Sequence, residues 1–160
     1  MPLNSISPIR VYADTSVYGG TFDAEFKSHS SLFFNQVRSG RFLLVSSAII
    51  DAELANAPAS VRQLAQDLQP LIEDAPVTAD AIDLHLAYLE AEVVGQGSAT
   101  DALHVAVATI VRCPVLVSWN FKHIVHRDKA PRYNAVNTLR NLPTIGIYSP
   151  AEVVSYEQGL

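Results

Sequence analysis

Residues 98–124 constrain the fold of this chain more than any other stretch. They begin with helix-start chemistry, continue as an apolar helix expected over 102–111, and pass through a Cys-Pro pair into a β-rich run at 115–118. A helix leading directly into a short apolar strand is half of a parallel α/β unit. In open sheets of such units, binding sites form outside the carboxyl ends of the strands. We therefore expect Asp101, at the helix start, and Asn120, just past the strand, to face one crevice.

The remainder of the chain alternates between β-rich runs and helical patterns. Strands are expected at 9–13, 42–45, 75–77 and 144–148, and helices at 31–38, 48–56, 60–68, 79–94 and 131–142, with a short helix from Ser149. The helix at 131–142 is expected to carry Val136 and Leu139 inward. Strands that alternate with helices predict an α/β fold, a parallel sheet covered by helices on both faces.

Composition bounds the class of protein. The chain has 160 residues, 49% of them apolar, which predicts one packed domain spanning residues 1–160. Acids outnumber bases 16 to 11, which argues against a generic, charge-driven coat for nucleic acid. No glycine-rich motif for a dinucleotide or a P-loop nucleotide is present.

The expected compartment follows from what the sequence lacks. The single Cys113 cannot form an internal disulfide and is expected to be a buried small hydrophobe. The first ten residues lack the pattern of a signal peptide, and no apolar run approaches the length of a membrane span. We expect a cytoplasmic protein with no membrane contact.

Three acids stand where chain crossings could converge. Asp14 ends the first strand, Glu53 lies in the helix after the second, and Asp101 lies in the first turn of the helix before the 115–118 strand. Asn120 adds a fourth oxygen. Carboxylates that approach one another need a cation to offset their repulsion, and oxygen-only ligands suit Mg²⁺ or Mn²⁺. Such an ion can supply an attacking water and neutralise a phosphoryl oxygen, which predicts phosphodiester cleavage.

Neighbouring residues could support this chemistry. Lys122, His123 and Arg127 follow Asn120 closely and are candidates to hold a polyanion, whereas Thr15 and Ser16 are candidate substrate-binding residues beside Asp14. Five of the 11 bases lie between 122 and 140, opposed only by Asp128. The alternative for these bases is a solvated helix face.

Each acid also has a structural explanation. The Asp-Thr-Ser run at 14–16 could be a turn in which the Asp bonds its own backbone. Ser98 and Asp101 have the spacing of a capping box. Glu53 could be an ordinary exposed acid, although Asp51, two residues earlier, must point to another helix face. His104 shares the face of Asp101 and is expected to be structural or supporting.

Four segments taken together resemble the PIN-domain family over nearly the whole chain. They are Val11-Tyr12-Ala13-Asp14-Thr15-Ser16-Val17-Tyr18, Ser46-Ser47-Ala48-Ile49-Ile50-Asp51-Ala52-Glu53, Ser98-Ala99-Thr100-Asp101-Ala102-Leu103-His104-Val105-Ala106 and Val117-Ser118-Trp119-Asn120-Phe121-Lys122-His123-Ile124. The last two are the more specific. The chain is most similar to the branch containing toxins of the VapC type, from bacterial toxin–antitoxin pairs.

The resemblance implies a three-layer α/β/α sandwich on a parallel sheet of about five strands, ordered 3-2-1-4-5. It implies an endoribonuclease that depends on Mg²⁺ or Mn²⁺, with Asp14, Glu53 and Asp101 as metal ligands. Asn120 falls where many members carry a fourth Asp, so this chain departs from the general pattern there. The partners implied are an RNA substrate, an antitoxin protein and a second copy in a homodimer.

A reading of another class remains open. Asn120 carries no charge and the chain is acidic overall, features compatible with a PIN-like module that binds RNA or protein but cleaves weakly or not at all. A nuclease acting on structured DNA is disfavoured, because the sequence contains no added segment for holding a duplex.

Overall fold

Five short strands pair in parallel in the order β3-β2-β1-β4-β5 in the computed structural model, which describes residues 7–155. The strands are β1 (Ile9–Ala13), β2 (Phe42–Ser47), β3 (Ile72–Ala75), β4 (Val115–Val117) and β5 (Gly146–Tyr148). The predicted fold class and strand order are confirmed. The predicted domain of 1–160 and the expectation about the N-terminal segment both extend to positions outside the described residues.

Central position in the sheet explains the apolar runs. Val11 and Tyr12 of β1 pair with Leu44 and Val45 of β2, and all four are completely buried. A parallel strand covered on both faces has no solvent side, so its sequence reads as a continuous apolar run rather than an alternation.

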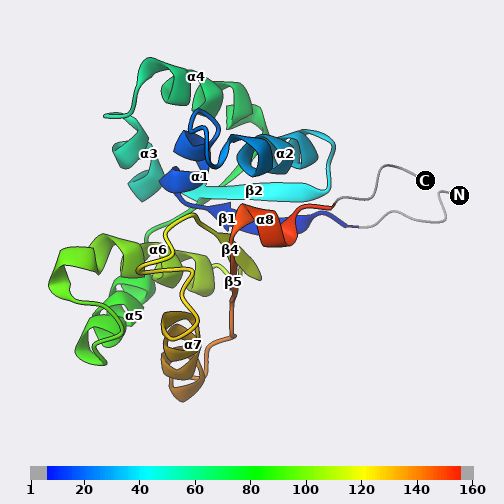
Figure 1. Ribbon diagram of the computed structural model, residues 1–160. Helices are drawn as coiled ribbons and strands as arrows, with labels where there is room; N and C mark the ends of the chain where they lie inside the picture. The colour runs from blue at the N-terminus through cyan, green and yellow to red at the C-terminus, as the bar shows by residue number, and fades with distance from the viewer. Residues whose placement is uncertain (1–6, 156–160) are drawn as a thin grey trace, which may run out of the picture.

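Helices form a layer on each side of this sheet (Figure 1). One layer holds α1 (Thr15–Gly20), α2 (Lys27–Arg38), α3 (Ala48–Leu54) and α4 (Ala59–Leu68), and the other holds α5 (Ala79–Glu90), α6 (Ala99–Ile110) and α7 (Lys129–Leu139). The last helix, α8 (Pro150–Val153), contacts α2. Short 3₁₀ turns, η1 (Gln69–Leu71) and η2 (Gln96–Ser98), precede β3 and α6.

The reversal of strand order positions the site. The chain builds outward from β1 through β2 to β3, then crosses to β4 on the other side of β1. Because crossovers are right-handed, that change of direction moves the helices to the opposite face. The segments that follow β1 and β4 therefore separate at their carboxyl ends, which is where ligands bind in open α/β sheets.

Two elements differ from the sequence prediction. The third strand lies at 72–75 rather than 75–77, since Leu44 to Ser47 of β2 select those residues as partners. The segment after Asp14, expected to be a turn, is the helix α1 despite its two glycines. A Cβ on Gly20 would lie 2.6 Å from Ser30 Oγ and 2.7 Å from Trp119 Nε1, so close packing and not helix propensity selects this glycine.

The inward face of α7 was predicted in part incorrectly. Tyr133 and Asn137 are completely buried, Val136 is half-buried, and Leu139 is 84% exposed. Asn137 occupies the interior because its Oδ1 accepts a 2.5 Å hydrogen bond from the buried Tyr88 hydroxyl. Leu139 is two residues after the buried Asn137, so the helix period places it on a different face, which is exposed to solvent.

Cys113 is buried as predicted, at 2% exposure, and burial raises the pKa of its thiol to about 11. Among the helices of the described part of the chain, none combines the length and the apolar character needed to cross a bilayer.

Candidate active site

Asp14 lies at the centre of the carboxyl edge of the sheet, directly after β1. It caps the N-terminus of α1, and its side chain is only 5% exposed. Oδ1 accepts bonds from the Ser16 N–H at 3.1 Å and the Ser16 hydroxyl at 2.5 Å, while Oδ2 accepts from the Ser118 hydroxyl at 2.6 Å. These bonds use three of the roughly four acceptor positions of a carboxylate, which leaves room for one further donor or cation.

Burial makes the charged form of the Asp14 carboxylate unfavourable. It raises the pKa of Asp14 above its ordinary value, although the hydrogen bonds from Ser118 and Ser16 and the nearby His104 act in the opposite direction. The ionised form is thus held by dipoles but not fully compensated. A cation at the remaining acceptor position would stabilise the ionised form of such a buried carboxylate.

Serine side chains fix Asp14 to the strand next to it. Ser16 Oγ accepts from the Trp119 backbone N–H at 2.8 Å, and Ser118 Oγ accepts from the Asn120 backbone N–H at 2.8 Å. Each hydroxyl therefore joins Asp14 to the backbone that leaves β4. This arrangement holds the β1 and β4 ends in register at the switch of strand order.

Glu53 reaches the same edge from α3 and is held there by α6. Its Oε1 bonds His104 Nε2, and its Oε2 accepts from the Thr15 hydroxyl at 3.2 Å. A carboxylate only accepts, so Nε2 of the imidazole carries a proton. Burial by itself would raise the pKa of Glu53, but the bonds from His104 and Thr15 lower it below its ordinary value.

A buried hydroxyl chain orients His104 in turn. Its Nδ1 lies 2.7 Å from the Tyr12 hydroxyl, which lies 2.8 Å from Ser47 Oγ. His104 is 2% exposed and Tyr12 is completely buried. This series of hydrogen bonds therefore joins four elements: Ser47 of β2 and Tyr12 of β1 are linked through His104 of α6 to Glu53 of α3. The supporting role expected of His104 matches this geometry.

Asp101 lies in the first turn of α6 and is partly buried. Ser98 occupies the N-cap position without a side-chain capping bond, so the capping box that the spacing suggested is not formed. Asp101 stands one turn before His104, whose ring binds Glu53. The alternative explanation of Asp101 as part of a capping box is therefore not supported by the structure.

Asn120 follows β4, but its amide oxygen is used by its own turn. Oδ1 accepts from the backbone N–H groups of Lys122 at 3.2 Å and His123 at 2.9 Å. In this arrangement the side chain caps a loop rather than extending an oxygen toward Asp14. Thr15 and Ser16, expected to bind substrate, use their hydroxyls to hold Glu53 and Asp14.

Hydrogen bonds link Glu53 through Thr15 to the segment after Asp14, and through His104 to the helix that carries Asp101. Within residues 7–155, no three Asp, Glu, His or Cys side chains are grouped closely enough to hold a metal ion by themselves. The oxygen donors nevertheless fit Mg²⁺ or Mn²⁺ in kind. Mg²⁺ commonly keeps several waters and is bound by one or two carboxylates together with substrate phosphate.

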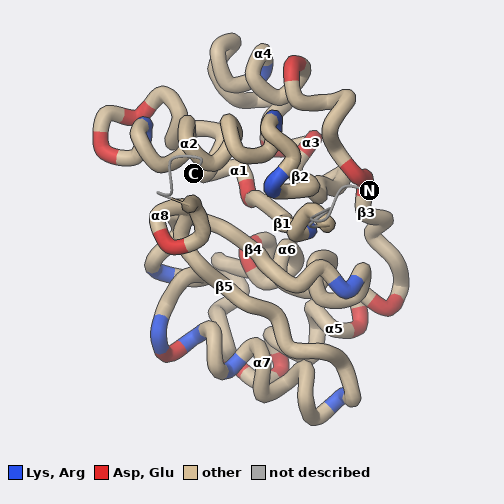
Figure 2. The backbone as a smooth tube through the Cα atoms, turned by 90° about the vertical axis from the view of Figure 1, so that its right-hand side faces the viewer, with Lys and Arg blue, Asp and Glu red and all other residues tan. Residues whose placement is uncertain are grey.

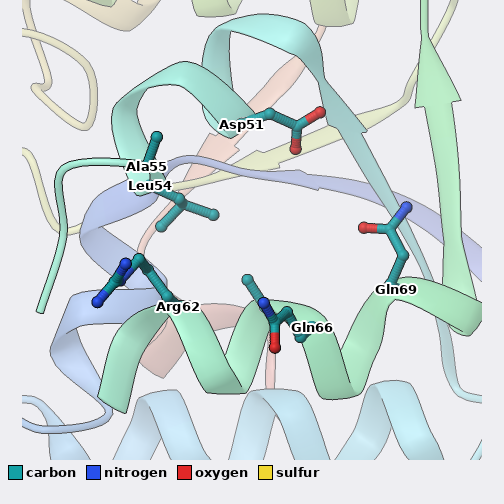
Figure 3. Close-up of a pocket in the computed structure, with 7 residues that line it drawn as sticks. Asp51, Leu54, Ala55, Arg62, Gln66 and Gln69 are labelled. Atoms are coloured by element: carbon teal, nitrogen blue, oxygen red, sulfur yellow. The ribbon is translucent and has the colours of Figure 1, made fainter. Parts of the chain in front are cut away.

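Asp51 and Glu53 lie on different sides of α3, as the helix periodicity predicted. Asp51 lines a cavity of about 390 Å³ between α3 and α4, together with Leu54, Arg62 and Gln66 (Figure 3). Figure 3 shows Asp51 and Leu54 extending from α3 toward the space above α4. This cavity holds one acid and is lined by neither Asp14 nor Glu53, which makes Asp51 a matched control for Glu53.

The bases after β4 gather along the segment that leads into α7 and along α7 itself (Figure 2). Lys122 and Arg127 are exposed, whereas Lys129 donates to the Val93 carbonyl at 3.0 Å. His123 is half-buried and its carbonyl accepts from the Tyr133 hydroxyl at 3.0 Å. Two of the three predicted polyanion contacts, Lys122 and Arg127, thus face solvent with their side chains.

Sequence reasoning missed Tyr12, Ser47 and Ser118 as parts of the site. Each lies at or near the carboxyl end of a central strand. Hydroxyl residues in otherwise apolar β-runs were the available signal, because a buried hydroxyl needs a hydrogen-bond partner.

Comparison with known proteins agrees with the fold. No family model and no curated protein matches the sequence. Among solved structures, a chain in the crystal structure of VapBC2 from Rickettsia felis, bound to a DNA fragment from their promoter, is similar with a TM-score of 0.54 and 13% identity. The match covers 86% of this chain and 96% of that chain. This likeness shows the fold alone, and it agrees with the α/β/α architecture and the strand order predicted from the sequence.

Proposed function

We propose that this protein is a metal-dependent endoribonuclease. The observation that carries the proposal is Asp14, a buried carboxylate at the switch of strand order whose hydrogen bonds leave room for one cation. Glu53 on α3 accepts a bond from Thr15, the residue after Asp14, and Asp101 on α6 stands one turn before His104, which bonds Glu53. The VapC-type resemblance of the sequence and the VapBC2-like fold support the same class of activity.

The residues have distinct roles in this proposal. Asp14, Glu53 and Asp101 would hold Mg²⁺ or Mn²⁺ together with RNA phosphate. When bound, the ion supplies an activated water and neutralises charge on the phosphate. Ser16 and Ser118 favour the ionised form of Asp14 and hold it in place, since they donate to both of its oxygens.

Further residues orient the flanking acid and the strand. His104 and Thr15 hold the two oxygens of Glu53, so this acid is positioned before RNA binds. Lys122 and Arg127 would attract the RNA backbone as exposed cations. Asn120 shapes the turn that carries Lys122.

A cleavage assay tests the proposal. Purified protein should cut single-stranded RNA with Mn²⁺ and not with EDTA. Asp14→Asn and Glu53→Gln should reduce the rate by more than the roughly 10- to 100-fold cost of losing an outer partner of a metal site. Asp51→Asn should retain the wild-type rate, because Asp51 lines the cavity between α3 and α4. Unchanged cleavage by Asp14→Asn would remove the proposed role of this carboxylate.

A binding module is the second candidate, and two observations favour it. The Asn120 oxygen faces its own turn, and no three-residue metal group exists among residues 7–155. Binding of RNA without cleavage of any member of a broad RNA panel, with Mn²⁺ present, would support this function over the nuclease.

We also propose a cytoplasmic toxin role with an antitoxin partner and a homodimeric state. The matched structure is of VapBC2 on promoter DNA, which supports a partner of this kind. Expression of the wild-type chain should arrest bacterial growth, and Asp14→Asn should not. Sedimentation of the purified chain measures whether it dimerises.

A further inference from the structure

A second recess lies at the same edge of the sheet, beyond β4. It has a volume of about 350 Å³ and lies between the segment after β4, the start of α7 and the residues after β5. Its lining includes Phe121, His126 and Arg127 from the segment after β4, together with Ile147 of β5 and Glu152 of α8. None of the three proposed metal ligands lines this recess, so it is separate from the carboxylate site.

Phe121 presents a supported aromatic surface. Its side chain is 49% exposed, yet its ring packs edge-on against Trp119 with centroids 6.1 Å apart. Trp119 is itself nearly buried, stacks on Phe26 at 4.3 Å and donates from Nε1 to Ser30 Oγ at 2.9 Å. An exposed phenyl ring backed by a fixed indole offers a rigid face to a flat ligand.

Backbone hydrogen bonds hold the loop around that ring. The Val125 N–H donates to the Asn120 carbonyl at 2.9 Å, and the Ala130 N–H donates to the His126 carbonyl at 2.9 Å. His126 Nδ1 accepts from the Asp128 backbone N–H at 3.1 Å, which requires the neutral ring to carry its proton on Nε2. His126, which lines the recess, therefore offers an N–H donor at Nε2.

Two side chains of opposite charge, Arg127 and Glu152, line the recess. Arg127 is exposed at the rim and lines the recess, where a guanidinium can pair with phosphate. Glu152 lines the recess from α8, held by a 2.7 Å bond from the Ser149 N–H to its Oε2. A carboxylate repels phosphate but accepts N–H groups of bases. Val125 and Ile147 give the recess apolar lining.

The position relative to Asp14 suits one RNA strand. Strands β1, β4 and β5 are adjacent, so two strand spacings, about 10 Å in total, separate the line of Asp14 from the end of β5. Ser118, which bonds Asp14, is three residues before Phe121. A strand with a phosphate at Asp14 could place a neighbouring base beside Phe121.

We propose that this recess binds one unpaired nucleobase of single-stranded RNA, stacked on Phe121, while Arg127 pairs with the adjoining phosphate. This inference rests on the proposed function in that it takes RNA as the substrate. It adds that the substrate must have an unstacked base next to the cleaved position. A duplex cannot present one, because its bases are paired and stacked on their neighbours.

Anisotropy of a labelled single-stranded RNA of mixed sequence, measured in EDTA, tests the recess without requiring cleavage. Phe121→Leu keeps an apolar side chain but removes the stacking face. It should weaken binding about 5- to 150-fold, the range that corresponds to losing one base–aromatic stack of about 1–3 kcal/mol. Phe121→Tyr should restore wild-type affinity. Phe22→Leu is the matched control, since Phe22 is 52% exposed and does not line the recess.

Salt dependence separates the two proposed contacts. Arg127→Gln should reduce the slope of log affinity against log salt by about 0.7, as expected for one lost phosphate contact on a single strand. Phe121→Leu should leave that slope unchanged. Circular dichroism and thermal melting of each variant verify that it is folded.

Three outcomes would overturn the inference. The first is an RNA affinity that Phe121→Leu leaves unchanged, and the second is an equal loss of RNA affinity in Phe22→Leu. The third is a Phe121→Leu variant in which only the sedimentation of the protein changes, which would make the recess a contact between copies. Failure of the nuclease proposal has a different signature. In that case the wild-type protein and its variants bind RNA in EDTA with the expected pattern, but the wild-type protein does not cut the RNA with Mn²⁺.

Discussion

Replacing Asp14 with Asn should stabilise the metal-free protein. The carboxylate is buried, and burial raises its pKa above the ordinary value. Asn retains an oxygen that can accept from the Ser16 N–H and hydroxyl, and it removes the cost of burying a charge. Each unit by which the pKa is raised corresponds to about 1.4 kcal/mol of lost stability once the group is ionised.

The pH dependence has a definite sign. Below the unfolded Asp pKa of about 3.9, both states are protonated and Asp14 costs nothing. Between that value and the raised folded pKa, the unfolded state binds fewer protons than the folded state, so stability falls as pH rises. Above the folded pKa the full cost is present. Asp14→Asn should lack this component, so its advantage over wild type should grow with pH and then level off.

Mn²⁺ should reverse the ranking of the two proteins. An ion bound only by the folded wild type adds about 2.7 kcal/mol when its concentration is 100 times the dissociation constant. Asp14→Asn should gain little, because it lacks the carboxylate proposed to hold the ion. Urea unfolding across a pH series, in EDTA and in Mn²⁺, measures both effects, with Asp83→Asn on the exposed face of α5 as the control.

Two results would refute this reasoning separately. If Asp14→Asn is less stable than wild type in EDTA at neutral pH, the hydrogen bonds to the carboxylate outweigh its desolvation. If wild type gains no stability from Mn²⁺, the protein does not hold the ion in the absence of RNA. The second result would mean that the ion binds only to the complex of the protein with RNA.

Three further predictions concern residues that support the site. Tyr12→Phe should lower stability by about 1–3 kcal/mol in urea unfolding, because it leaves His104 Nδ1 buried without the hydroxyl 2.7 Å away; an effect below the error of the measurement would contradict this. Gly20→Ala should cost about 1–3 kcal/mol, since its Cβ would meet Trp119 Nε1 at 2.7 Å, and an unchanged melting temperature would show that the indole can move. Cys113, with a thiol pKa of about 11 and 2% exposure, should react slowly with a thiol reagent in the folded protein and rapidly in urea, whereas equal rates would contradict its burial.

The sequence by itself determined the class of fold and the neighbourhood of the site. The β-rich run at 9–13 and the continuous apolar run at 42–45, with a helical pattern between them, predicted buried parallel strands. Asp14 and Asn120 follow β1 and β4, so any parallel sheet with these strands adjacent brings them to one edge. The spacing of Asp51 and Glu53 likewise fixed that they face different sides of α3.

Only the tertiary structure decided which side chains meet. Tyr12, Ser47, His104 and Glu53 come from four elements, and the bonds that join them depend on strand register and helix rotation. The exposed Leu139 is a second case: a local apolar pattern gives a periodicity, but which face of α7 is buried depends on packing against other elements, where Tyr88 bonds the buried Asn137. Hydrogen bonds act over about 3 Å, and sequence spacing does not resolve positions across elements to that distance.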